Sequence, residues 1–293
     1  MARLDGQVAL VIGAALGLGR GYAKALARSG QHVVLCDTRP EVEQVAKDLQ
    51  RYGVRALSCV ADVSSPSDVR RVVDDSLAEF GRIDILIADA GIWRGGGPKD
   101  NLGKSLADYD ALIGVNLRGA NLFGRAVIPA MIAAGGGHMI NIATDHVHTH
   151  PGRPTAGGST MDLYDTSKWA LNGLTDGGAQ ALAPHNIRMN VLAIGPTDTE
   201  MLRALFKPGG KLAHLFGPEG RPDRRPHRRL GRPANRTGSA QALGRARPRA
   251  SGFHRPIPAR FWPDTVDRRA GAGQAPYRRP ADGYVKTLHV SVY

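Results

Sequence analysis

A tyrosine and a lysine four positions apart, Tyr164 and Lys168, are the side chains in this sequence best suited to moving a proton. On a helix this spacing places both on one face. A tyrosine phenol, with a pKa near ~10, is a poor base at neutral pH, but a nearby ammonium stabilises the phenolate and lowers that pKa. The pair could therefore exchange a proton with a hydroxyl group. Because a Tyr-x-x-x-Lys arises by chance in about every second chain of this size, its surroundings must decide.

A glycine-rich turn near the N-terminus is the first of those surroundings. Residues 7–12 form an apolar run typical of a buried strand, residues 20–29 have helical spacing, and Gly13, Gly17 and Gly19 lie between them. Glycines in such a turn let the backbone approach a pyrophosphate, and the helix N-terminus faces the anion. The turn could also be purely structural, but its strand–turn–helix context favours a dinucleotide site.

Asp37, at the end of a second predicted strand over residues 32–36, indicates which dinucleotide. A carboxylate about twenty residues after the turn accepts hydrogen bonds from both adenosine ribose hydroxyls. It also repels a 2′-phosphate, which favours NAD over NADP. Arg39 is the counter-argument, since its guanidinium could hold that phosphate, although Leu16 offers no second cation. We expect NAD as the cofactor.

Strand-like and helix-like segments alternate along the rest of the first two thirds of the chain. The further predicted strands cover residues 54–60, 83–87, 138–142 and 187–194, and the further helices cover 67–80, 109–134, with Pro129 near a kink or end, and the segment that carries Tyr164. This alternation predicts an α/β fold, a Rossmann-type doubly wound parallel sheet with helices on both faces. Ligands of such sheets bind at the carboxyl ends of the strands.

Taken in order, these motifs resemble the short-chain dehydrogenase/reductase family over about residues 5–205. The matching positions are the glycine turn, Asp37, Asp62-Val63, Ala88-Asp89-Ala90-Gly91, Asn116, Thr144, Tyr164 with Lys168, and Gly195 with Thr199. The resemblance implies an NAD(P)-dependent alcohol dehydrogenase or ketone reductase that moves a hydride between the cofactor and a secondary alcohol or ketone. One rival is a catalytically impaired dinucleotide-binding protein.

The resemblance also implies roles for individual residues. Tyr164 would be the general acid/base, Lys168 would bind the nicotinamide ribose and lower the pKa of Tyr164, and Asn116 would complete a proton relay to Lys168. Asp62 and Val63 would flank the adenine, and Thr199 would meet the carboxamide. The implied cofactor-binding set is Gly13, Leu16, Gly17, Leu18, Gly19, Asp37, Asp62, Val63, Ala90, Gly91, Tyr164, Lys168, Gly195, Thr197 and Thr199.

Four positions depart from the family pattern. Ile12 replaces a threonine before the first glycine, Asp89 lies in a segment that is usually Asn-Asn-Ala-Gly, and Ile194 replaces a proline. We expect the change at Asp89 to weaken a structural hydrogen bond. Thr144 occupies the position of the usual catalytic serine. Its hydroxyl can still donate to a developing alkoxide, although its methyl group restricts the rotamer, so we expect a working threonine rather than a crippled site.

The substrate pocket is expected to include Thr144, Tyr164, His146 and Trp93. The segment between Thr144 and Tyr164 is about seven residues longer than the family's usual spacing, as surface loops tolerate. His146, His148 and His150 alternate and could share one face of a strand, but no metal is expected. Trp93 could equally serve as ordinary packing.

The C-terminal quarter differs in composition, so we predict a catalytic domain over residues 1–216 and a largely disordered tail over 217–293. The tail holds 17 Lys+Arg and 5 Asp+Glu, against 22 and 21 before it, which accounts for nearly all of the net charge of +13. A basic arm could bind nucleic acid. Out-of-frame translation of a GC-rich gene would give the same composition, and we favour it. Residues 284–293 are the only candidate for a last edge strand.

The composition indicates the cellular compartment in which the protein is expected. Cys36 and Cys59 lie in apolar runs, which predicts buried free thiols in a reducing compartment. No apolar run reaches the ~18 residues of a membrane span, and the start lacks the features of a signal peptide. We therefore expect a cytoplasmic protein with a small-molecule substrate, no membrane partner and a homo-oligomeric state, tetramer or dimer.

Overall fold

One parallel sheet organises the molecule. The computed structural model describes residues 6–95, 100–144, 162–195, 197–205 and 288–290, and all of them belong to one unit, residues 1–224 with 282–293. The sheet has the strand order β3-β2-β1-β4-β5-β6-β7, and every neighbouring pair is parallel. The strands are β1 (Val8–Ile12), β2 (His32–Asp37), β3 (Ala56–Val60), β4 (Ile85–Ala88), β5 (Gly137–Thr144), β6 (Ile187–Ile194) and β7 (Leu288–Val290).

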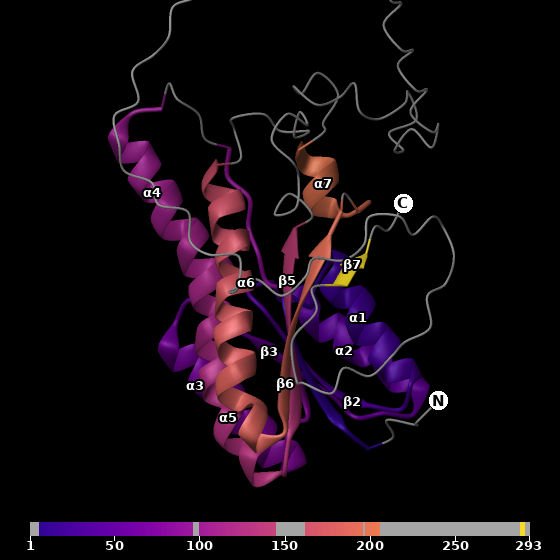
Figure 1. Cartoon of the computed structure of the whole chain (residues 1–293). Helices are drawn as coiled ribbons and strands as arrows, with labels where there is room; N and C mark the ends of the chain where they lie inside the picture. Colours follow the sequence, from indigo (N-terminus) through magenta and orange to yellow (C-terminus); the bar gives the residue numbers. More distant parts are fainter. Residues whose placement is uncertain (1–5, 96–99, 145–161, 196, 206–287, 291–293) are drawn as a thin grey trace, which may run out of the picture. The chain divides into compact units, whose positions relative to one another are not determined.

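Helices cover both faces of this sheet (Figure 1). The helices α1 and α2 lie on one face, and α3, α5 and α6 pack on the other. Their bounds are α1 (Gly17–Arg28), α2 (Glu41–Leu49), α3 (Pro66–Phe80), α4 (Leu102–Ile113), α5 (Ala120–Ala133), α6 (Asp162–Leu182) and α7 (Glu200–Leu205). The structure confirms the predicted doubly wound α/β fold, because parallel strands joined by crossover helices give this architecture.

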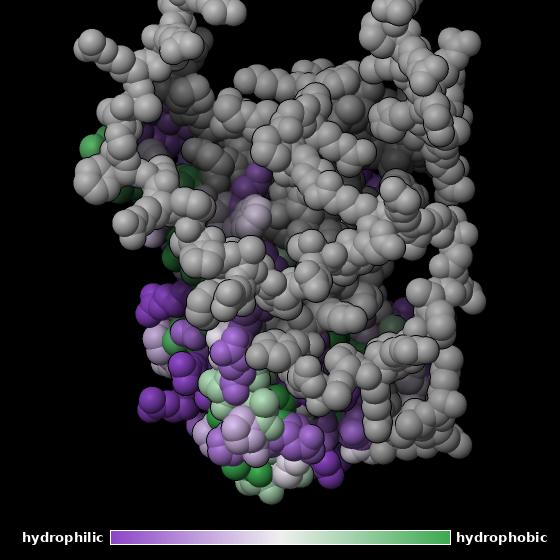
Figure 2. Space-filling view, in the orientation of Figure 1, coloured by the Kyte–Doolittle hydropathy of each residue, from purple (hydrophilic) through white to green (hydrophobic). Residues whose placement is uncertain are grey.

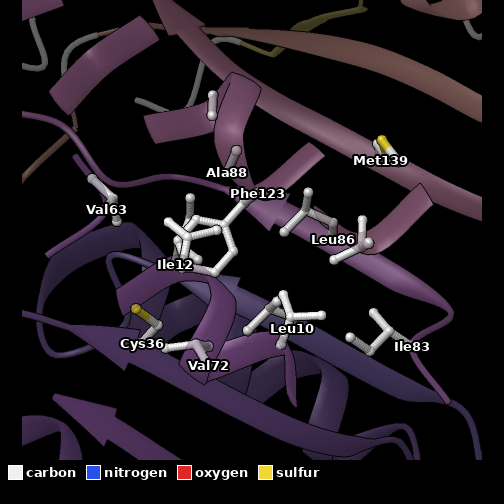
Figure 3. Close-up of a cluster of buried hydrophobic side chains, with 14 of the residues drawn as sticks. Leu10, Ile12, Cys36, Val63, Val72, Ile83, Leu86, Ala88, Phe123 and Met139 are labelled. Atoms are coloured by element: carbon white, nitrogen blue, oxygen red, sulfur yellow. The ribbon is translucent and has the colours of Figure 1, made fainter. Parts of the chain in front are cut away.

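The core consists of two layers separated by the sheet. The strand β1 is buried along its whole length, as an apolar strand in the middle of a parallel sheet must be. Its side chains alternate, so that Leu10 and Ile12 pack under α3 and α5, whereas Ala9 and Val11 pack under α1 and α2. Figure 3 shows Ile12 beside the ring of Phe123, a fully buried residue of α5.

The helix predicted over residues 109–134 differs in detail. It begins earlier, at Leu102, because the Asn101 side chain accepts a hydrogen bond from the Lys104 N–H at 2.8 Å and caps the first turn. It is also not one regular helix: residues Gly114–Gly119 form a π-helical turn between α4 and α5. Pro129 lies inside α5, four residues before the end of that helix. The apolar pattern alone could not show the earlier start, because Leu102 is 74% exposed.

The edge of the sheet beyond β6 carries β7, whose three residues lie within the predicted segment 284–293. The rest of the predicted tail, residues 217–287 and 291–293, lies outside the described residues. The described part of the face in Figure 2 mixes hydrophilic with hydrophobic side chains. Cys36 and Cys59 are buried free thiols, as predicted, and lie opposite each other in the neighbouring strands β2 and β3.

Candidate active site

The glycine turn between β1 and α1 packs too closely against its surroundings for a side chain at Gly13 or Gly19. Gly13 has a φ of +84°, and a Cβ added there would lie 2.6 Å from the backbone nitrogen of Ala90. A Cβ on Gly19 would lie 2.0 Å from the carbonyl oxygen of Gly13. The turn is further held by the Gly13 N–H, which donates to the Cys36 carbonyl at 2.8 Å. These contacts bring the ends of β1, β2 and β4 together at the start of α1.

A cavity of about 290 Å³ lies where this turn faces the segment after β6. It is lined by Gly17, Leu18, Arg20, Gly21, Thr197, Asp198, Thr199, Glu200 and Arg203. Two ion pairs border it, Arg20–Glu200 at 3.4 Å and Arg203–Asp198 at 2.7 Å. The first turn of α1 presents backbone N–H groups at this place, and the positive end of the helix dipole favours an anion there.

Asp37, at the end of β2, lies against the same turn. One carboxylate oxygen accepts a hydrogen bond from the Ala15 N–H at 2.9 Å, and the other accepts one from the Arg39 N–H at 3.0 Å. The guanidinium of Arg39 pairs loosely with Glu41 at 4.0 Å and is more than half exposed. Asp37 is thus fixed in place, whereas the Arg39 side chain is held only weakly.

Asp62 and Val63, the two residues predicted beside the adenine, have side chains in different environments. The Asp62 carboxylate accepts hydrogen bonds from the backbone N–H and the hydroxyl of Ser64, both at 2.8 Å. Val63 is only 4% exposed and packs with Ile12 and Cys36 in the core (Figure 3). Its side chain is therefore taken up by packing, which leaves its backbone for contacts with a ligand.

Tyr164 and Lys168 lie one turn apart on α6, as the spacing predicted. Tyr164 is half-buried, whereas Lys168 is only 5% exposed. The Lys168 ammonium donates a hydrogen bond to the Ile142 carbonyl oxygen at 2.8 Å, which ties α6 to β5 just before Thr144. Burial lowers the pKa of Lys168 to about 8, and the negative charge of Asp89 partly opposes this shift. Thr144 ends β5 and is itself buried.

Asn116 lies in the π-helical turn and joins the same cluster. Its side-chain oxygen accepts a hydrogen bond from the Ile92 N–H at 2.8 Å, and its amide donates to the Ser167 hydroxyl at 2.9 Å. The Ser167 hydroxyl donates in turn to the Tyr164 carbonyl oxygen at 2.7 Å. A Cβ added to Gly91 would lie 3.2 Å from the Lys168 ammonium and 3.4 Å from the Asn116 side-chain oxygen. Gly91, Asn116 and Lys168 therefore meet at one point, a placement common for π-helical turns at functional sites.

The remaining predicted site residues are placed as follows. The Thr197 hydroxyl donates to the Gly195 carbonyl oxygen at 3.0 Å, and the Thr199 hydroxyl accepts from the Leu202 N–H at 3.3 Å. Trp93 follows Ile92 directly and is half-buried, and its indole N–H has no hydrogen-bond partner among the described residues. His146, with the other alternating histidines, lies outside the described residues. Within the described ranges, no group of three or more His, Cys, Asp or Glu side chains could hold a metal ion.

Asp89, which directly follows Ala88 at the end of β4, connects the glycine turn with Lys168. Its carboxylate lies against Gly19 and interacts electrostatically with the Lys168 ammonium. Burial raises the pKa of Asp89 to about 7, and Lys168 and the Gly19 N–H partly offset that rise. A polar side chain thus still lies against the turn at this position despite the departure from Asn-Asn-Ala-Gly.

Comparison with known families agrees with this fold. The family model described as short chain dehydrogenase matches residues 7–209, more than two thirds of the chain. The protein therefore belongs to the short-chain dehydrogenase/reductase family, a family of oxidoreductases. The oxidoreductase UcpA of Escherichia coli is 34% identical over 209 residues, which cover 71% of this chain and 75% of that protein.

Solved structures give the same result. A 7α-hydroxysteroid dehydrogenase in complex with NADH and 7-oxo glycochenodeoxycholic acid superposes with a TM-score of 0.64 and 27% identity, covering 71% of this chain and 77% of that one. A short chain dehydrogenase from Burkholderia cenocepacia in complex with NADP has a TM-score of 0.61 and 34% identity, covering 68% and 78% of the two chains.

Sequence reasoning missed several residues of this site. Ser167 lies between Tyr164 and Lys168, and its position within that motif was the only signal. Arg20 and Arg203 border the cavity, and Arg20 could have been found because it directly follows Gly19. The carbonyl of Ile142 carried no signal, since a backbone group is the same in every residue.

Proposed function

We propose that this protein is an NAD-dependent oxidoreductase that interconverts a secondary alcohol and its ketone, with Tyr164 as the general acid/base. The observation that carries the proposal is the placement of Tyr164 and Lys168 on one face of α6, with the buried Lys168 ammonium fixed to the Ile142 carbonyl oxygen at 2.8 Å. A desolvated ammonium one helical turn away stabilises a phenolate and lowers the pKa of the tyrosine.

The residues at the glycine turn fit a dinucleotide. Cβ atoms on Gly13 and Gly19 would collide with neighbouring backbone atoms, so the turn is tightly packed and has no side chains at these two positions. The adjoining cavity of about 290 Å³ has Arg20 and Arg203 at its border. The turn and the start of α1 would hold the pyrophosphate, Asp37 the adenosine ribose and Lys168 the nicotinamide ribose. When bound, the dinucleotide supplies the hydride acceptor or donor.

The chain's own residues move the proton. In the oxidative direction, Tyr164 as phenolate takes the proton of the substrate hydroxyl, and Lys168 stabilises that phenolate beforehand. Thr144, at the end of β5, donates a hydrogen bond to the substrate oxygen and orients it. Asn116 would complete the path by which the proton passes from Tyr164 and Lys168 to solvent. In the reductive direction the same tyrosine returns the proton to the alkoxide.

NAD rather than NADP is proposed from Asp37. Its carboxylate is held at the end of β2 by the N–H groups of Ala15 and Arg39, where it would accept from the ribose hydroxyls and repel a 2′-phosphate. The related solved structures contain NADH in one case and NADP in another, so the proposal rests on the residues of this chain.

The substrate class, the pocket residues, the domain bounds, the localisation and the oligomeric state are also proposals. A secondary alcohol is favoured because the related 7α-hydroxysteroid dehydrogenase holds a 7-oxo compound, the ketone of such an alcohol. Trp93 and His146 are proposed to line the substrate pocket. We further propose residues 1–216 as the catalytic domain, which the family match over residues 7–209 supports, and a cytoplasmic homo-oligomer. No helix in the described ranges is long and apolar enough to span a membrane.

Tyr164→Phe tests the proposal. The variant keeps the ring and loses the hydroxyl, so turnover with a panel of secondary alcohols and ketones should fall by about a hundredfold or more, while NADH binding stays unchanged. Both are followed through the absorbance and fluorescence of NADH. Activity within tenfold of the parent protein would overturn the role of Tyr164. A parent protein that binds NADH but turns over no alcohol or ketone would favour the rival, a dinucleotide-binding protein without catalysis.

A further inference from the structure

A second ionisable group lies beneath the glycine turn and has no part in the reaction as described above. Asp89 begins the segment after β4, where its backbone N–H donates to the Ile12 carbonyl oxygen at 3.1 Å. Its carboxylate lies against Gly19, 3.0 Å from the place where a Gly19 Cβ would be. Gly19 belongs to the first turn of α1, the turn whose N–H groups face the cavity.

The charged and ionisable groups around Asp89 come from three elements. The phenol of Tyr22, one turn further along α1, is half-buried, and burial together with Asp89 raises its pKa to about 12. Asp37 at the end of β2 repels the Asp89 carboxylate, and Lys168 on α6 attracts it. Burial is the largest influence and disfavours the charged form, so the pKa of Asp89 is raised to about 7. Asp89 is therefore balanced between its two protonation states near neutral pH.

Binding of a dinucleotide would disturb this balance. A pyrophosphate brings negative charge to the N-terminus of α1, where the Asp37 carboxylate already accepts from the Ala15 N–H and the Asp89 carboxylate lies against Gly19. Repulsion between the pyrophosphate and the half-buried Asp89 carboxylate is less screened there than in bulk water, whereas protonation of Asp89 removes it. The Asp89 carboxyl group can hold a proton and still present an acceptor oxygen to the turn.

We propose that Asp89 is a positioning residue that couples dinucleotide binding to proton uptake: the protonated carboxyl group supports the glycine turn around the pyrophosphate, and the carboxylate opposes it. The inference rests on the proposed function and adds a pH-dependent control of cofactor affinity to it. The proton comes from solvent, and no covalent bond of the cofactor changes. Affinity is accordingly highest below the pKa of Asp89 in the free protein and falls as the pH rises through that value.

Calorimetric titration of the full chain with ADP-ribose and with NADH tests the proposal. ADP-ribose carries the pyrophosphate but lacks the nicotinamide, so it reports on the glycine turn without any redox step. The dissociation constant should rise about five- to tenfold between about pH 6 and about pH 8.5, equivalent to roughly one unit of difference in pKa between free and bound protein. At about pH 7.5, the binding heat should differ between phosphate and Tris buffers because a proton is taken up.

Two variants separate Asp89 from other groups. Asp89→Asn keeps an acceptor oxygen beside the turn but cannot be ionised, so it should bind ADP-ribose with little dependence on pH and without the buffer-dependent heat. Asp75→Asn on α3 makes the same change in net charge at an exposed position and should behave as the parent protein. Lys168 also titrates near this range, and any proton uptake that persists in Asp89→Asn belongs to Lys168 rather than to Asp89.

Each outcome is decisive. A pH-independent dissociation constant in the parent protein, or an Asp89→Asn variant with the parent's pH dependence, overturns the inference but leaves the proposed function intact. Absence of ADP-ribose and NADH binding at every pH overturns both. If Asp89→Asn does not fold, absence of the buffer-dependent heat in the parent protein still refutes proton uptake.

Discussion

The ammonium group of Lys168 donates a hydrogen bond to the backbone carbonyl oxygen of Ile142 at 2.8 Å. This bond crosses from α6 to β5 and lies two residues before Thr144, the end of that strand. It therefore holds the helix that carries Tyr164 at a defined position relative to the strand that carries Thr144. A buried ammonium without such an acceptor would be strongly destabilised, so the bond also explains how Lys168 can stay charged at only 5% exposure.

Replacement of Lys168 by methionine should abolish turnover but not folding. The change removes the ammonium that stabilises the Tyr164 phenolate, so we expect kcat to fall by about a hundredfold or more. Stability should change little, because removal of a desolvated charge offsets the loss of its hydrogen bond to Ile142. Steady-state kinetics and urea denaturation measure the two effects. The control, Lys47→Met at the exposed end of α2, should retain full activity, and an equally active Lys168→Met would refute the assigned role.

Thr144 should tolerate serine but not valine. Valine has nearly the same volume as threonine at this buried position but lacks the hydroxyl, so Thr144→Val should lose about a hundredfold or more in kcat. Thr144→Ser keeps the donor and should stay within about tenfold of the parent, since only a methyl group is lost. Comparison of kcat for the two variants is the measurement. A fully active valine variant would mean that the substrate oxygen is bound elsewhere.

Asp37 should determine the choice of cofactor. Asp37→Ala removes the acceptor for the ribose hydroxyls and the repulsion of a 2′-phosphate, so NAD binding should weaken and its advantage over NADP should narrow by about tenfold or more. The ratio of kcat/KM for NAD and NADP, measured on parent and variant, tests this. A parent protein that prefers NADP would show that the Arg39 guanidinium outweighs Asp37.

Stability should depend on pH through Asp89. Its pKa is raised by burial to about 7 in the folded protein, whereas an unfolded chain has a value near ~3.9. The folded state therefore binds more protons than the unfolded state between these values, and the contribution of Asp89 to stability falls as the pH rises from about 4 to about 7. Urea denaturation of the parent and of Asp89→Asn should show a difference that grows across this range, to a few kcal/mol at most. A difference that is the same at about pH 4 and about pH 8 would contradict the assignment.

Local features of this protein could be predicted from the chain alone. The alternation of apolar runs with helical spacing identified six strands of the sheet, and β6 was predicted with the bounds Ile187–Ile194 that the structure has. The glycine turn and the pair Tyr164 and Lys168 are likewise defined by residues close together in sequence. Backbone periodicity and turn chemistry act over a few residues, so they can be recognised in the sequence before the fold is known.

The tertiary structure decided which distant residues meet and what this does to their charges. The Asn116 amide bonds to Ser167 across 51 positions of sequence, and Asp89 lies against Gly19 only because β1 and β4 are neighbours in the sheet. Val63 matched a cofactor-binding position, yet its side chain belongs to the core. A pKa depends on burial and on charges brought close by the fold. The sequence therefore identifies Asp89 and Lys168 as candidates, whereas the shifts in their pKa values arise only when the fold packs other elements around them.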